Sequence, residues 1–90
     1  LLCGSNTCNV NPSKPIKTGL SKLVSKLETR FKILLKSSLV VVFQYDGGVE
    51  VSLFNGGRML IKNIRDENAA VNVFDSVIRF LGEKSRTKTN

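Results

Sequence analysis

Apolar residues recur along this chain with two different periods, and the change of period separates helices from strands. Between residues 20 and 27 they occur at i, i+3, i+4 and i+7, as Leu20, Leu23, Val24 and Leu27. This spacing lines one face of a helix and predicts an amphipathic helix of about three turns. Thr18, just before the run, is the expected N-cap.

The period is two from residue 31 to residue 62, which is typical of strands. The stretches 46–48 (Asp-Gly-Gly) and 55–57 (Asn-Gly-Gly) supply residues that tolerate positive φ, so each is predicted to be a tight turn. A further break falls at Ser37 and Ser38. The segment therefore predicts a four-strand antiparallel meander.

Shorter signals complete the predicted order of elements. Residues 7–11 read as a strand half-buried through Cys8 and Val10. A second helix is predicted after Asp66, with a broad apolar stripe from Ala70 and with Gly82 as its stop. Residues 83–90 are polar and are expected to form a mobile tail.

These elements predict one α+β domain over residues 1–82, in the order β-α-β-β-β-β-α. The economical arrangement places both helices on one face of a single curved antiparallel sheet. Strict alternation then sends Leu34, Phe54, Leu60 and part of residues 40–43 to the opposite face, beside Arg58 and Lys62. Large exposed apolar patches usually mark an interface, so we expect a second copy or another domain to cover this face.

Composition narrows the class of protein. The chain has 90 residues, of which 41% are hydrophobic and 23% charged, as in ordinary globular domains. No apolar run approaches the length of a membrane span, and no signal peptide is visible. We expect a cytoplasmic location, and the start at Leu1 without methionine suggests a piece of a longer protein.

Catalytic and metal-binding constellations are missing from the sequence. Cys3 and Cys8 have no histidine to join them as zinc ligands or to act as a base. Reduced thiols are the favoured interpretation, with a disulfide between them as the alternative. Residues 55–57 lead into a strand rather than a helix, which favours a hairpin turn over a phosphate loop. We therefore expect no enzymatic activity, cofactor or metal in this chain.

The net charge of +7 is unevenly distributed. Residues 1–40 hold seven basic side chains against Glu28 alone, whereas residues 41–90 hold seven basic and six acidic ones. Lys22 and Lys26 place part of this charge on the outer side of the first helix. Such an excess favours a nucleic acid, an acidic protein or an acidic companion domain as partner, and the alternative is a solvated basic face.

Three stretches resemble one known family: LCGSNTCNVNP near the start, FNGGRMLIKNIRDENAA, and RFLG. They resemble the C-terminal region of the ThiF/MoeB/HesA group of ubiquitin-activating-enzyme-like adenylyltransferases. The residues that match the first family pattern are Cys3, Gly4, Asn6 and Val10. Those that match the second are Phe54, Gly57, Arg58, Ile61, Lys62, Asp66, Ala70, Phe80, Leu81 and Gly82. Ser5 stands where the family has an arginine.

The resemblance implies a parent enzyme that uses ATP to adenylate the C-terminal carboxylate of a ubiquitin-like or sulfur-carrier protein. Its structural zinc would be held by two Cys-x-x-Cys pairs, and neither these nor a nucleotide loop occurs in this chain. The chain would then be an accessory domain without catalytic residues. It would pack on the adenylation domain, aid homodimerisation or help to hold the carrier protein.

Two other functions are carried as alternatives. The order of elements is also that of half a TATA-binding-protein-like fold, whose sheet binds the DNA minor groove through apolar wedges and basic residues. Tyr45 is the one aromatic residue with a polar tip for such a surface. The third hypothesis is a purely structural oligomerisation domain. The candidate binding residues are Phe54, Arg58, Leu60 and Lys62, together with Lys22 and Lys26.

Overall fold

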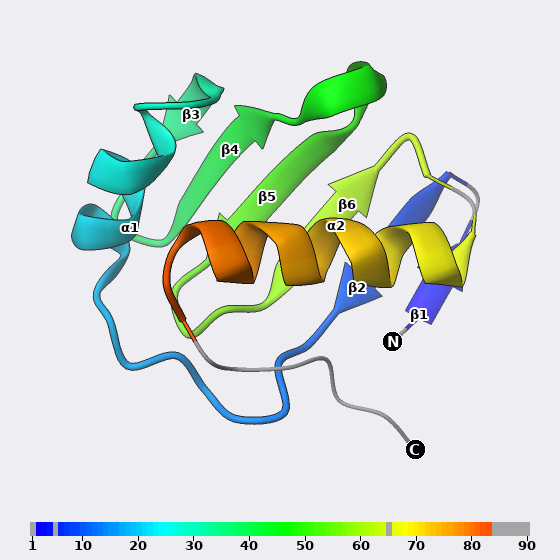
Figure 1. Cartoon of the computed structure of the whole chain (residues 1–90), viewed down its shortest axis with the longest axis horizontal. Helices are drawn as coiled ribbons and strands as arrows, with labels where there is room; N and C mark the ends of the chain where they lie inside the picture. Colours follow the sequence, from blue (N-terminus) through cyan, green and yellow to red (C-terminus); the bar gives the residue numbers. More distant parts are fainter. Residues whose placement is uncertain (1, 5, 65, 84–90) are drawn as a thin grey trace.

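The computed structural model describes residues 2–4, 6–64 and 66–83, and its strands form one six-stranded sheet (Figure 1). The strands are β1 (Leu2–Gly4), β2 (Thr7–Val10), β3 (Lys32–Lys36), β4 (Val40–Gln44), β5 (Glu50–Phe54) and β6 (Met59–Lys62). Their order across the sheet is β1-β2-β6-β5-β4-β3, and every neighbouring pair is antiparallel. The predicted α+β class and the β3–β6 meander are confirmed.

Two helices, α1 (Leu20–Leu27) and α2 (Glu67–Phe80), lie on the same side of the sheet (Figure 1). Alternate residues of the inner strands point toward them and are fully buried, among them Val41, Phe43 and Ile61. The predicted helical stripes meet these residues, since Leu23, Leu27, Phe74 and Val77 are all at most 1% exposed. The core thus lies between the helices and one face of the sheet.

The N-cap predicted from the sequence is correct for α2 and wrong for α1. Asp66 is the N-cap of α2, and its Oδ1 accepts a hydrogen bond from the Asn68 backbone N–H at 3.0 Å. The cap predicted at Thr18 is wrong, because α1 begins after Gly19 without a side-chain cap. Thr18 Oγ1 instead donates to Glu83 Oε2 at 3.1 Å and so ties the entry of α1 to the end of α2.

The turn at 55–57 requires its glycines. Gly56 and Gly57 have φ values of +98° and +105°, which side chains rarely adopt. Gly57 is also buried against the segment before α1: a Cβ there would lie 2.7 Å from Ile16 Cδ1. The backbone N–H of Ile16 donates to the Gly56 carbonyl at 2.8 Å. The turn therefore anchors the long connection between β2 and α1.

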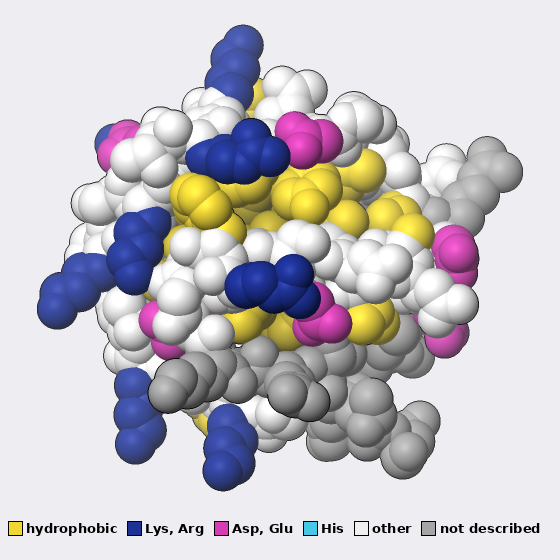
Figure 2. All heavy atoms as spheres, in the orientation of Figure 1, with side chains coloured by type: hydrophobic (Ala, Val, Ile, Leu, Met, Phe, Trp, Pro, Cys, Tyr) yellow, Lys and Arg dark blue, Asp and Glu magenta, His cyan; other side chains and the backbone are white. Residues whose placement is uncertain are grey.

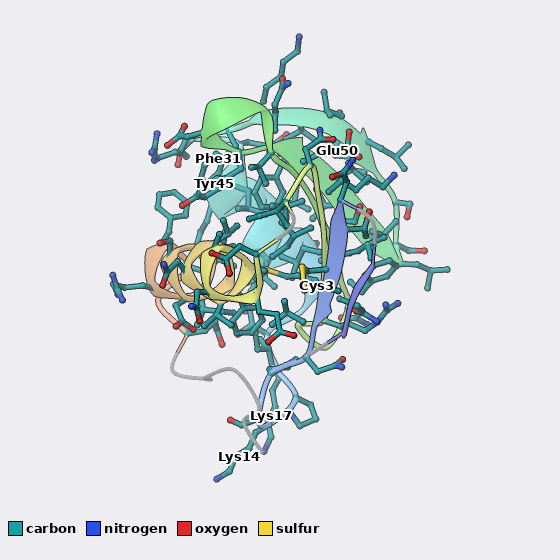
Figure 3. The ribbon with its side chains drawn as sticks, turned by 90° about the vertical axis from the view of Figure 1, so that its right-hand side faces the viewer. Cys3, Lys14, Lys17, Phe31, Tyr45 and Glu50 are labelled. Carbon is teal, nitrogen blue, oxygen red and sulfur yellow. A yellow bond between two sulfur atoms is a disulfide. The ribbon has the colours of Figure 1, made fainter. Side chains whose placement is uncertain are left out.

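Strand β1 has no counterpart among the predicted elements. It pairs with β2 so that Cys3 lies directly opposite Cys8, and the two sulfurs form a disulfide. The favoured interpretation of reduced thiols is therefore wrong for this structure. Figure 3 shows Cys3 between the strands and α2, and Cys8 is fully buried. The disulfide thus belongs to the helix side of the sheet. The predicted tail, after Glu83, lies outside the described residues.

Candidate functional site

The sheet face turned away from both helices, here called the open face, is covered by no other element among the described residues. In Figure 3, α2 lies on one side of the strands and Glu50 on the other. The strand register arranges the open-face residues in cross-strand rows. One row is polar and consists of Thr7, Lys62, Glu50, Gln44 and Lys32.

A second part of the open face is apolar and is here called the apolar strip. Its members are Leu35, Val40, Val42, Phe54 and Leu60. Leu60 and Val42 flank Ser52, and their bulk leaves that small polar side chain only 7% exposed. Four members of the strip are partly exposed, and Leu35 is 55% exposed. The strip therefore runs across four strands, and no helix or strand of the described residues lies over it.

The alternation predicted for the first strand of the meander is partly wrong. The register of β3 shifts between Ile33 and Leu35, so that Leu35 pairs with Val42 on the open face. Leu34 lies at this irregularity and is 45% exposed. A β-bulge adds one residue to a strand and changes the side to which later residues point. Leu35, rather than Leu34 as predicted, thus belongs to the apolar strip.

Two of the basic residues that border the strip, Arg58 and Lys62, already have partners. The Arg58 guanidinium lies 4.0 Å from the centre of the Phe54 ring and donates to Asn9 Oδ1 at 3.3 Å. Lys62 Nζ lies 3.6 Å from Glu50 Oε2. Phe54, Arg58, Leu60 and Lys62 are therefore brought together on one face, as the alternation predicts. Arg58 is held over the sheet by its contact with Phe54, whereas the Lys62 side chain is 50% exposed.

Lys22 and Lys26 are not part of this arrangement. Both are exposed on α1, which covers the other face of the sheet. Lys26 Nζ donates to the Leu81 carbonyl at 2.8 Å, so this lysine closes the end of α2. The six candidate residues therefore divide between two sides of the molecule, and only four can contact one partner surface.

The helix side carries a second feature that the sequence did not predict, an aromatic cluster of Phe31, Tyr45 and Phe80. The Phe31 ring centre lies 5.6 Å from those of Tyr45 and Phe80, and Phe80 is 38% exposed. Figure 3 shows Phe31 and Tyr45 together, and Figure 2 shows hydrophobic side chains at the surface of this side. Tyr45 is therefore unavailable to a ligand on the open face, where the nucleic-acid hypothesis would need it.

Groups that could carry metal chemistry are not assembled in the described part of the chain. No three His, Cys, Asp or Glu side chains lie close enough there to hold an ion. Within the same residues, neither helix is long and apolar enough to cross a membrane. The open face, with its apolar strip and the charges beside it, is therefore the candidate site in the described residues.

No family model, curated protein or solved structure matches this chain.

Proposed function

We propose that this chain is a non-catalytic interaction domain that binds a partner protein through its open face. The observation that carries the proposal is the apolar strip, in which Leu35, Val40, Val42, Phe54 and Leu60 lie on one face of four neighbouring strands. Contiguous apolar patches on a protein surface usually mark interaction sites. Burial of the strip by a partner would remove its apolar side chains from water, which favours association.

The resemblance to ThiF/MoeB/HesA-type adenylyltransferases indicates which partner we propose. If the chain is the C-terminal domain of a ThiF/MoeB/HesA-type adenylyltransferase, the open face packs on the adenylation domain of the same parent protein. ATP and zinc then belong to that domain, which also activates a ubiquitin-like or sulfur-carrier protein. The present chain contributes rigid contact area, either to the adenylation domain or to a second copy of itself.

Parentage is tested by the gene sequence on the 5′ side of the Leu1 codon. A glycine-rich strand-to-helix nucleotide motif followed by two Cys-x-x-Cys pairs supports it. A gene that encodes neither refutes the adenylyltransferase origin but leaves the interaction role standing.

The interaction role is tested by sedimentation velocity of the chain alone and with the rest of its parent protein. Leu60→Lys should abolish association, because it places a charge within the apolar strip, at its β6 end. Gln44→Lys is the matched control, since Gln44 is exposed in the polar row of the same face. Retention of every complex by the Leu60 variant would refute the role assigned to the strip.

One observation favours a second candidate, nucleic-acid binding. Lys32, Arg58 and Lys62 border the apolar strip, a combination that suits phosphates beside inserted apolar side chains. Titration of the chain against duplex DNA at two salt concentrations separates the candidates. Tight binding that weakens steeply as salt rises would favour this function, because released counterions then drive the association.

A further inference from the structure

Strand β3 lies at one end of the sheet and pairs only with β4 (Figure 1). Four of its five residues are exposed. Three of the four large hydrophobic side chains exposed in the described residues lie in β3 or in the turn after it: Leu34 at 45%, Leu35 at 55% and Leu39 at 71%. An edge strand presents unpaired backbone N–H and C=O groups, and this one also presents apolar side chains.

The turn that carries Leu39 is held by its own hydrogen bonds. Ser37 Oγ accepts from the backbone N–H groups of Leu39 and Val40 at 3.2 and 3.1 Å. The Leu39 carbonyl accepts from the Asn55 backbone N–H at 3.2 Å. The exposed side chain of Leu39 therefore stands on a fixed backbone beside the turn at 55–57.

Charge argues against a second copy of β3 as the occupant of this edge. Lys32 and Lys36 stand at the two ends of the strand, and both are exposed. Two β3 strands side by side would place four lysines along one seam, two on the open face and two on the helix side. Like charges close to each other across a strand pair are unfavourable, which disfavours a second copy at this edge.

Lys32 favours an acidic occupant. Lys36 Nζ already contacts Glu28 Oε2 at 3.1 Å, whereas Lys32 forms no ion pair within the described residues and lies on the open face opposite Gln44. Leu35 faces the same side opposite Val42. A strand that paired antiparallel to the outer side of β3 in the same register as β4 would meet Leu35 first and Lys32 two residues later, as β4 does with Val42 and Gln44.

We infer that the outer edge of β3 binds an extended segment of a partner protein that carries an apolar residue followed, two positions later, by Asp or Glu. Backbone hydrogen bonds to β3 give such strand addition its affinity, and the alternate side chains give it selectivity. The inference rests on the proposed interaction role and states the chemistry of the partner. The added strand would extend the apolar strip by one strand.

The probe for this edge is a fluorescein-labelled octapeptide, Ser-Val-Thr-Val-Thr-Glu-Thr-Gly, titrated with the chain and followed by fluorescence anisotropy. Two matched peptides accompany it: one has Lys in place of Glu, and the other has N-methyl groups on alternate backbone nitrogens. The chain should bind the Glu peptide about fivefold more tightly than the Lys peptide, because one cross-strand attraction becomes a repulsion. The N-methylated peptide should not bind, since its backbone cannot pair.

Charge reversal at Lys32 tests whether the Glu of the peptide lies beside this lysine. Lys32→Glu should reverse the preference, so that the Lys peptide binds more tightly than the Glu peptide. Lys17→Glu makes the same change of charge at an exposed residue before α1 and should leave the preference unchanged. Absence of binding by any peptide, equal binding of all three, or an equal effect of the two lysine variants would overturn the inference.

Failure of this inference is distinguishable from failure of the proposed function. Loss of peptide binding with intact Leu60-dependent association would leave the interaction role in place and remove only the acidic segment. Loss of both, in a chain whose far-ultraviolet circular dichroism shows it to be folded, would refute both proposals.

Discussion

Replacement of Gly57 by alanine should be among the most damaging small changes in this protein. The new Cβ would lie 2.7 Å from Ile16 Cδ1, 2.9 Å from Ile16 Cγ1 and 3.3 Å from Pro12 Cγ. Carbon atoms attract best at about 3.5–4.0 Å, so all three contacts are too short. The Ile16 backbone is held by its hydrogen bond to the Gly56 carbonyl, so relief must come from the Ile16 side chain.

Two costs combine in this variant. A side chain at φ +105° costs about 1–3 kcal/mol of backbone strain. The overlap with Ile16 costs about 1–3 kcal/mol more, by analogy with overpacked cores. Gly57→Ala should therefore destabilise the domain by roughly 2–6 kcal/mol, a large part of the total stability of a chain of this size.

Gly56→Ala is the matched control, because Gly56 has φ +98° but a Cβ there meets nothing within 4 Å. The Gly57 variant should be less stable than the Gly56 variant by about 1–3 kcal/mol, or roughly 4–20 °C in Tm. Urea and thermal unfolding followed by circular dichroism measure both quantities. Equal losses of stability in the two variants would refute the reasoning about Ile16. It would also be refuted if Gly57→Ala cost as much stability in an Ile16→Ala background as it does in the natural chain.

Three further predictions use the same unfolding measurements. Reduction of the Cys3–Cys8 disulfide should destabilise the domain by about 2 kcal/mol, the value for a loop of about six residues, and an unchanged Tm in reductant would contradict it. Asp66→Ala should cost about 1 kcal/mol through loss of the α2 cap, whereas Asp66→Asn keeps the acceptor and should cost much less. Asp46→Asn should change stability by less than about 1 kcal/mol, because the side chains of its ion pair with Arg30 are 52% and 70% exposed, and a larger loss would show a role beyond that pair.

The parts of the fold that could be predicted from sequence are those with a local cause. The Asn-Gly-Gly turn, the Asp66 cap and the buried stripe of α2 each depend on residue types at fixed short spacings. The pairing of β1 with β2 could not be predicted in this way, since three residues are too few to show a period. Its one signal was the spacing of Cys3 and Cys8, which allows the two residues to face each other across a tight hairpin.

The candidate site was predictable only where alternation held. Phe54, Arg58, Leu60 and Lys62 follow an unbroken period of two and lie where the pattern places them. Leu35 does not, because the irregularity in β3 is caused by pairing with β4 and leaves no mark in the composition. The aromatic cluster escaped prediction for a related reason: Phe31, Tyr45 and Phe80 come from three separate parts of the chain.

The place of β2 inside the sheet, between β1 and β6, has a consequence for folding kinetics. Cys8 pairs with Ile61, whereas the pairings within β3–β6 join neighbours in the sequence. Pairing of β2 with β6 closes a much longer loop than any hairpin of the meander does, and it therefore costs more conformational entropy. The meander can form first, and β2 joins it late. During synthesis, the first strands of the chain must therefore remain unpaired with β6 until β6 has left the ribosome. Until β2 docks on it, β6 is itself an open edge, and a chain stalled between formation of the meander and docking of β2 would be most prone to pair with another.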